Sequence, residues 1–341
     1  MKIESDKKLD FSDVLIRPKR SVLSSRSQVS LERTFKFPHS NMTWTGVPII
    51  AANMDTVGTY EVYNVLSQYK VITALHKFYT LNHYKRMNLN PDYFMVSSGI
   101  KDSDFENLCN IVDNIETKFI CIDVANGYMK KLVDFCSRIR AKYPNHILVA
   151  GNVVSREITE ELIMRGKVDI VKVGIGSGAS CTTRLKTGVG MPQLSAVIEC
   201  SDAAHGVGGL IISDGGITCP GDMAKSFGGG SDFVMMGGQF AGHDENPGDT
   251  IERDGKFYKV FYGMSSKKAM EKHYGKMENY RSSEGRQLEI PYKGSINETI
   301  KDFLGGLRST CTYINAKCIK HIPKCTTFLL VNNQLNRFFV R

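Results

Sequence analysis

Eight short apolar runs rich in β-branched residues recur along this chain of 341 residues, and each ends in glycine or a small polar residue. Most run starts lie roughly 22 to 28 residues apart, which suits one strand followed by one covering helix. Strands that are apolar throughout and alternate with helices are typical of a parallel sheet covered on both faces. Eight such units predict an α/β fold, a closed (β/α)8 TIM barrel, with an open doubly wound sheet as the competing fold. The runs start near Val47, Val71, Tyr93, Phe119, Ile147, Asp169, Gly209 and Asp232.

The segments between these runs have helical periodicity. Residues 103–115 carry apolar side chains at positions 105, 108, 111, 112 and 115, and we expect Ser103 to cap the helix. The same reasoning predicts helices within 127–142 and 154–165, and a further helix over 299–318 that could close the barrel. The alternation of strand and helix is therefore supported by both kinds of element.

We expect the whole chain, 1–341, to form a single barrel domain with two additions. Residues 1–46 are an N-terminal extension before the first barrel strand. Residues 241–297 follow the eighth strand and are polar, which favours a C-terminal lid or flap segment over a separate domain. Polar residues such as Asn53, Asp123 and Asn152 stand at the carboxyl ends of the predicted strands. In a barrel, the loops that carry the active site converge at that rim.

Net charge and cysteine content limit the ligands and the cellular compartment that suit this protein. The charge of 44 − 35 = +9 suits small anionic ligands such as phosphates, permits weak nucleic-acid contact, and is equally compatible with an unspecific basic surface. Nine cysteines, an odd number without a CxxC pair, argue against a disulfide framework or a zinc ribbon and indicate a reducing, cytoplasmic location. A charged start and the lack of a long apolar stretch predict neither a secretory signal nor a membrane span.

The segment 172–190, KVGIGSGASCTTRLKTGVG, is the most informative. Its glycines at 174, 176 and 178 can turn backbone groups toward a phosphate or a cation. Cys181, in this loop near Arg184, is a candidate nucleophile of lowered pKa. An isolated loop cysteine is more often an ordinary packed thiol.

Two further glycine clusters, SDGG at 213–216 and MGGQFAG at 236–242, follow the seventh and eighth predicted strands. The loops after those strands are the usual phosphate site of this fold. Asp214 suits ribose hydroxyls better than a phosphate, so the cluster indicates a nucleotide monophosphate. The alternative is that the glycines serve turns and Asp214 caps a helix.

At these loops the sequence resembles the IMP dehydrogenase and GMP reductase family. The resemblance is carried by GIGSGASCTTRLKTGVGMPQ, SDGGITCPGDMAKSFGGGSDFVMMGG, FYGMSS, AANMDTVG and CIDVANGY, and runs in order from Asp10 to about Thr327. The family implies a (β/α)8 barrel whose loop cysteine attacks C2 of a purine nucleotide. This chain reads GSGA at 176–179, where the family usually has GPGS, and has one extra residue within 164–170. The lost proline should loosen the cysteine loop.

Within the family, the lid segment resembles the reductases. NYRSSEG at 279–285 has glutamate at position 284 where dehydrogenases generally have glutamine, and FSDVLIRPKRS at 11–21 and SSR at 24–26 are also reductase-like. The short interval from Lys77 to Phe94 leaves no room for the dehydrogenases' usual regulatory domain. The implied reaction is NADPH-dependent reductive deamination of GMP to IMP and ammonia. Three alternatives remain: a dehydrogenase that lacks its regulatory domain, a non-enzymatic nucleotide- or RNA-binding barrel, and a flavin-dependent barrel oxidoreductase.

The resemblance also implies residue roles. Cys181 would form a covalent thioimidate at purine C2, with Thr183 and Glu284 as a proton relay. The nucleotide would be bound by Asp214, Gly215, Gly216, Gly237, Gly238, Gly263, Met264, Ser265, Arg281, Ser282, Ser283, Glu284 and Gly285. NADPH would contact Ser25, Arg26, Lys77, Asp123, Val124, Ala125, Ile175, Gly176, Met264, Tyr280, Arg281, Ser309, Thr310, Cys311 and Thr312. Some of the NADPH contacts would come from a neighbour in a homotetramer, and no specific nucleic acid is expected. A monovalent cation, K⁺, would lie at Gly176, Gly178, Cys181 and Arg184.

Overall fold

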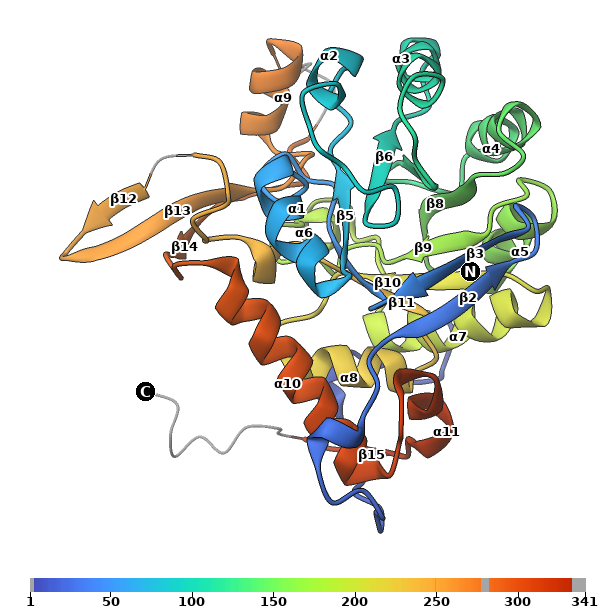
Figure 1. Cartoon of the computed structure of the whole chain (residues 1–341), viewed down its shortest axis with the longest axis vertical. Helices are drawn as coiled ribbons and strands as arrows, with labels where there is room; N and C mark the ends of the chain where they lie inside the picture. The colour runs from blue at the N-terminus through green and yellow to red at the C-terminus, as the bar shows by residue number, and fades with distance from the viewer. Residues whose placement is uncertain (1–2, 249, 277–281, 333–341) are drawn as a thin grey trace.

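The computed structural model describes residues 3–248, 250–276 and 282–332. Its centre is a closed barrel of eight parallel strands, and each of the eight predicted runs forms one of these strands (Figure 1). The predicted TIM barrel is confirmed, and the open doubly wound sheet is wrong because β11 pairs with β4 to close the ring. The strands are β4 (Ile49–Ala51), β5 (Ile72–Leu75), β6 (Phe94–Ser98), β7 (Phe119–Asp123), β8 (Ile147–Val153), β9 (Ile170–Val173), β10 (Leu210–Asp214) and β11 (Phe233–Met236).

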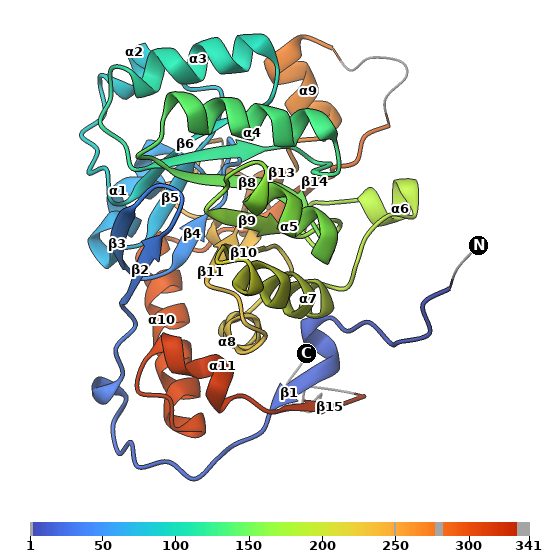
Figure 2. The same cartoon turned by 90° about the vertical axis from the view of Figure 1, so that its right-hand side faces the viewer.

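Helices connect the strands and cover the barrel from outside (Figure 2). The predicted helices form with shifted ends, and the predicted cap at Ser103 is wrong. Helix α3 begins at Asp102 with Lys101 as its N-cap, because the Asp104 carboxylate accepts the Lys101 amide at 3.0 Å. The covering helices are α1 (Tyr60–Leu66), α2 (Leu81–Tyr84), α3 (Asp102–Val112), α4 (Lys130–Lys142), α5 (Arg156–Met164), α7 (Gln193–Gly206), α8 (Pro220–Gly228) and α10 (Ile296–Ile314), with short α6 (Thr183–Thr187) ahead of α7.

The N-terminal extension seals the end of the barrel opposite the rim. Strands β2 (Arg33–Phe37) and β3 (Met42–Gly46) form an antiparallel hairpin. The Phe35 ring stacks on Phe233 with centroids 4.4 Å apart, and Trp44 meets Phe119 edge-on at 6.0 Å. These rings join the inward-facing barrel side chains in one buried cluster, so this end of the barrel is a filled core.

A strand near each end of the described chain pairs with the other below the barrel. Strand β1 (Val14–Ile16) pairs with β15 (Phe328–Leu330), which follows helix α11 (Ile322–Cys325) (Figure 2). Within the described residues, no helix has the length and apolar character needed to cross a membrane.

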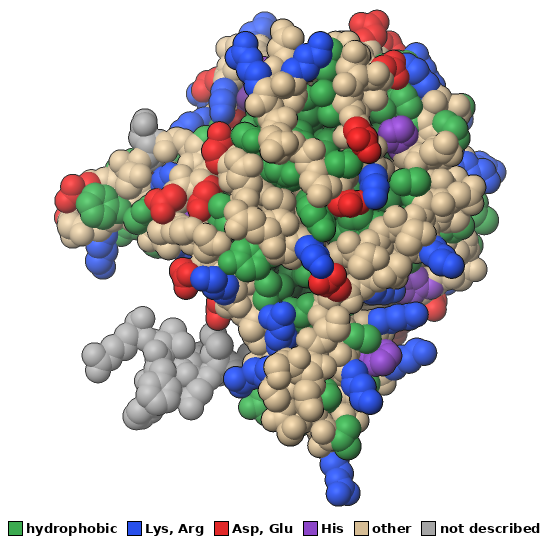
Figure 3. Space-filling view, viewed as in Figure 1, with side chains coloured by type: hydrophobic (Ala, Val, Ile, Leu, Met, Phe, Trp, Pro, Cys, Tyr) green, Lys and Arg blue, Asp and Glu red, His purple; other side chains and the backbone are tan. Residues whose placement is uncertain are grey.

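The predicted lid segment, 241–297, has secondary structure of its own. Strands β12 (Thr250–Arg253), β13 (Lys256–Tyr262) and β14 (Gln287–Pro291) form an antiparallel sheet that projects from the barrel (Figure 1). Helix α9 (Lys267–Tyr274) lies between β13 and β14 in sequence and stands beside the rim. Acidic and basic side chains are interspersed around this part of the visible face (Figure 3).

Candidate active site

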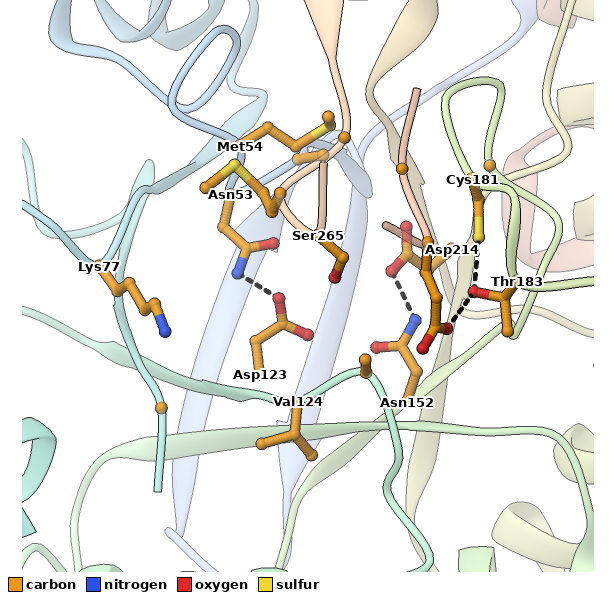
Figure 4. Close-up of a pocket in the computed structure, with 18 of the residues that line it drawn as sticks. Asn53, Met54, Lys77, Asp123, Val124, Asn152, Cys181, Thr183, Asp214 and Ser265 are labelled. Carbon is orange, nitrogen blue, oxygen red and sulfur yellow. Dashed lines mark hydrogen bonds between the residues drawn. The ribbon is translucent and has the colours of Figure 1, made fainter. Parts of the chain in front are cut away.

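A cavity of about 650 Å³ opens among the carboxyl ends of the barrel strands. Cys181 and Thr183 line one end, Lys77 lines the other, and two amide–carboxylate pairs lie between them (Figure 4). The volume is within the range of a small-molecule site. Among the predicted site residues, the cavity is lined by Lys77, Asp123, Val124, Ala125, Ile175, Gly176, Gly178, Cys181, Thr183, Asp214, Gly215, Gly263, Met264, Ser265, Glu284 and Gly285.

Cys181, Thr183 and Glu284 form a continuous hydrogen-bonded chain. The Cys181 thiol donates to Thr183 Oγ1 at 3.2 Å, and the Thr183 hydroxyl donates to Glu284 Oε2 at 2.9 Å (Figure 4). Cys181 is only half-buried, so its sulfur is accessible from the cavity. The arrangement can accept a proton from sulfur and store it on a carboxylate, as expected for an activated nucleophile.

Backbone contacts hold the two segments of this chain together across 101 residues of sequence. The Thr182 amide donates to the Glu284 carbonyl at 2.8 Å, and the Arg286 amide donates to the Ser180 carbonyl at 2.9 Å. Cys181 also forms a β-bridge with Gly285. Residues 284–286 of the segment 241–297 are therefore attached to the cysteine loop, which explains how a glutamate so distant in sequence reaches Thr183.

Close packing of two loops places Asp214 beside the cysteine loop. At Gly174, where φ is +151°, a Cβ would lie 2.1 Å from the Asp214 carbonyl oxygen, so glycine is required. The Ser177 hydroxyl donates to that same carbonyl at 3.0 Å. The Asp214 carboxylate accepts from Asn152 Nδ2 at 2.8 Å and keeps 20% of its side chain exposed, so it can accept a ligand hydroxyl.

The Asp123 carboxylate is hydrogen-bonded in the same way as that of Asp214. It accepts from Asn53 Nδ2 at 2.7 Å and from Lys172 Nζ at 2.9 Å. Burial would raise the pKa of this carboxyl, but the Lys172 charge and the two hydrogen bonds hold it below its ordinary value. Lys172 is a site residue that the sequence analysis missed. The signal was a lysine at an inward position of the otherwise apolar run IVKV.

The outer part of the cavity is formed partly by helix α9, through Met270 and Tyr274. Asp55, just after β4, anchors this helix: its Oδ2 accepts from Lys272 Nζ at 2.8 Å and from His273 Nε2 at 2.6 Å. The Phe78 ring stacks on His273 with centroids 3.4 Å apart. The segment 241–297 is thus fixed to the rim at a second place, next to Lys77.

The remaining predicted residues fall into three groups. Five of them do not line the cavity: Gly216, Ser282 and Ser283 lie within two residues of lining positions in sequence, whereas Gly237 and Gly238 directly follow β11. Tyr280 and Arg281 lie outside the described residues. The short helix η2 (Arg26–Gln28) packs against α10, and neither contributes a residue to the lining of the cavity in this single chain. The structure therefore does not bring Ser25, Arg26, Ser309, Thr310, Cys311 and Thr312 to the cavity.

The predicted cation ligands are backbone groups of one loop. The Gly178 carbonyl already accepts the Cys181 amide at 3.0 Å, which leaves its second lone pair for a ligand. Arg184 is directed elsewhere, because its guanidinium donates to the Met191 carbonyl at 2.6 Å and pairs with Asp10 at 3.3 Å. Its stem packs on Gly176, where a Cβ would lie 2.6 Å from Arg184 Cγ. Arg184 thus stabilises the cysteine loop by packing against it.

Comparison with known proteins decides the family. The model of the IMP dehydrogenase / GMP reductase domain matches residues 8–335. The chain belongs to this family. It is 56% identical to human GMP reductase 2 over 342 residues, covering 99% of this chain and 98% of that protein. Identity to the GMP reductase of Tolumonas auensis is 55%, with 98% of each chain covered. Identity to the GMP reductase of Caenorhabditis elegans is 53%, with 99% of this chain and 96% of that protein covered.

Proposed function

We propose that this protein is a reductase that converts GMP to IMP and ammonia at the expense of NADPH, through a covalent intermediate on Cys181. The observation that carries the proposal is the hydrogen-bonded chain from the Cys181 thiol through Thr183 to Glu284, at one end of a cavity large enough for a nucleotide. A carboxylate that can hold a proton suits a reaction in which a poor leaving group must be protonated. The names of the relatives support the same substrate.

The chain's own residues account for the first half of the reaction. Thr183 takes the thiol proton as Cys181 becomes a thiolate, and passes its own proton to Glu284. The thiolate sulfur forms a bond to C2 of GMP, and the electron pair of the C2–N3 double bond moves onto N3. Glu284 then returns the proton through Thr183 to the 2-amino group. The pair on N3 restores the double bond as the bond from C2 to the amino nitrogen breaks and ammonia leaves. The product is a thioimidate, with sulfur attached to C2.

The second half regenerates the thiolate. NADPH, when bound, supplies the hydride that ends on C2. The C2–S bond breaks, its electron pair returns to Cys181, and IMP leaves with the new hydrogen on C2. Splitting one hard substitution into two displacements is the usual advantage of a covalent nucleophile.

Residues along the cavity divide between the two ligands in this proposal. Asp214 and Gly215 would receive the ribose and phosphate of GMP near Cys181, while Asp123 and Lys77 would receive NADPH at the other end. Lys77 is suited to a phosphate because its ammonium group is a compact point charge. Contacts from Ser25, Arg26 and 309–312 would come from a neighbouring subunit of a homotetramer, since these residues lie away from the cavity of their own chain. K⁺ would be held by carbonyls of the cysteine loop, and the segment 241–297 would act as the lid.

The nearest alternative is a dehydrogenase that oxidises IMP with NAD and must activate water. The glutamate at 284, hydrogen-bonded to Thr183, favours the reductase. The test is a pair of assays on the full chain: NADPH oxidation with GMP, and NAD reduction with IMP, each followed at 340 nm. GMP-dependent loss of NADPH supports the proposal. NADH formation with IMP, and no NADPH loss with GMP, would overturn it.

A further inference from the structure

A lysine lies inside the barrel. On β9, Ile170 faces the interior cluster, while Val171 and Val173 face the covering helices. Because side chains alternate along a strand, Lys172 must point inward. It is 1% exposed, at the floor of the cavity. A buried ammonium group without partners would be strongly unfavourable, so its surroundings must compensate.

Two carboxylates from two other strands supply that compensation. Lys172 Nζ lies 2.9 Å from Asp123 Oδ1 of β7 and 3.3 Å from Asp214 Oδ2 of β10. Each carboxylate also accepts from an asparagine of a further strand end, Asn53 for Asp123 and Asn152 for Asp214. One cation thus neutralises two carboxylates that would otherwise repel each other in a poorly solvated cavity.

The two carboxylates serve different ligands under the proposed function. Asp123 lies toward Lys77, and Asp214 lies toward Cys181 (Figure 4). In the proposed function these are the sides of the cofactor and of GMP. A carboxylate that receives ribose hydroxyls must be ionised to act purely as an acceptor. We propose that Lys172 is a positioning residue, which neutralises Asp123 and Asp214, holds them in register and so links the cofactor half of the cavity to the substrate half. The assignment of ligands to the two halves rests on the proposed function, whereas the neutralisation of the carboxylates does not.

A pH dependence follows from this arrangement. The titratable groups that face Lys172 are Asp123 and the buried thiol of Cys121 on β7, and Asp214 on β10, while Lys77 faces Asp123. Burial raises the pKa of Cys121 to about 12, so this thiol stays neutral at physiological pH. Removing the Lys172 charge would leave burial to dominate at Asp123. Its folded-state pKa would then rise, and the carboxyl would take up a proton at a higher pH than in wild type.

The experiment compares Lys172→Met with wild type in two measurements between pH 6 and pH 8.5. The first is the unfolding midpoint without ligand. A carboxyl whose folded pKa is raised stabilises the fold below that pKa, so the midpoint of Lys172→Met should rise relative to wild type as the pH falls. The second is calorimetric binding of IMP and of NADP⁺, without turnover. Affinity of the variant should fall by about tenfold per pH unit below the raised pKa, whereas wild type should be nearly flat.

Matched variants separate charge from packing. Lys225→Met removes another buried lysine with a carboxylate neighbour, Asp222 at 3.6 Å, from helix α8 outside the cavity. It should lower the midpoint without changing the pH profile of binding. If Lys172→Met does not fold, Lys172→Gln and Lys172→Arg replace it, and only the uncharged glutamine should show the pH dependence.

The outcomes are distinguishable. The uncharged variants Lys172→Met and Lys172→Gln are compared with the charged wild type and Lys172→Arg. If the pH profile of unfolding is the same in both groups, Lys172 contributes only packing and the inference is overturned. If the unfolding profile shifts as expected but wild type binds neither IMP nor NADP⁺, the neutralising role stands and the proposed function fails.

Discussion

Asp55→Asn should release helix α9 from the rim. In the native protein, one buried carboxylate oxygen accepts from Tyr262 Oη and Lys272 Nζ, each at 2.8 Å, and from His273 Nε2 at 2.6 Å. Burial would raise the pKa of Asp55, but the hydrogen bonds from Lys272, His273 and Tyr262 bring it below its ordinary value. The carboxylate is therefore ionised near neutral pH. Its stabilising effect on the docked helix would be lost only as the pH falls below the ordinary range of an aspartate.

These contacts set the free energy that Asp55→Asn should remove from the docking of α9. A hydrogen bond to a charged group is worth about 1.5–3 kcal/mol, and asparagine keeps a neutral acceptor that retains part of it. Lys272 is half-exposed, so its ion pair is screened and should add little. We expect a loss of about 2 kcal/mol in the docking of α9, which corresponds to a roughly 30-fold larger opening equilibrium.

Hydrogen–deuterium exchange measures this opening directly. The amides of Met270 and Gly275, which donate within α9, should exchange roughly 30-fold faster in Asp55→Asn, while those of α4 and α5 should keep wild-type rates. Asp244→Asn is the control, because its carboxylate accepts from the exposed hydroxyl of Tyr292 elsewhere on the lid segment. Unchanged exchange in α9 would refute the view that Asp55 anchors it.

Three further substitutions test separate parts of the account. Glu284→Gln should lower turnover of GMP by about 10²–10⁴-fold, because the carboxylate that accepts and returns the proton is lost, while IMP binding stays near wild type. Near wild-type turnover in the 340 nm assay would refute the proton relay. Trp44→Ala should lower the free energy of unfolding by about 3–5 kcal/mol in urea titration, because the ring is 1% exposed and plugs the barrel; a loss below about 1 kcal/mol would contradict that role. Gly174→Ala should weaken IMP binding by at least about tenfold, because its Cβ would collide with the Asp214 carbonyl and displace that loop; unchanged calorimetric affinity would show that the loops adapt.

The barrel could be predicted because its strands are apolar on both faces. Each run from Val47 to Asp232 had to be covered by helices, and their number and spacing left little choice of fold. The N-cap of α3 was misplaced by two residues, at Ser103 and not at Lys101, because the carboxylate of Asp104 accepts the Lys101 amide. Such local choices are decided by geometry that a sequence pattern does not contain.

The site was predictable in part. Cys181 stands in a glycine-rich loop, so its accessibility could be expected, but the pairing of Glu284 with Thr183 depends on a β-bridge between segments far apart in sequence. Only the family resemblance pointed to that glutamate. Lys172 was passed over because a single charge in an apolar strand has no meaning until the barrel brings Asp123 and Asp214 to it.

The most direct test of the central claim is the rate of NADPH oxidation at 340 nm with GMP added, in wild type and in Cys181→Ala, with ammonia measured in parallel. We predict GMP-dependent loss of NADPH matched by release of ammonia in wild type. In Cys181→Ala, which should still bind IMP, both signals should disappear. Turnover that persists in Cys181→Ala would show that the reaction does not pass through a bond to this sulfur, and the account would be contradicted.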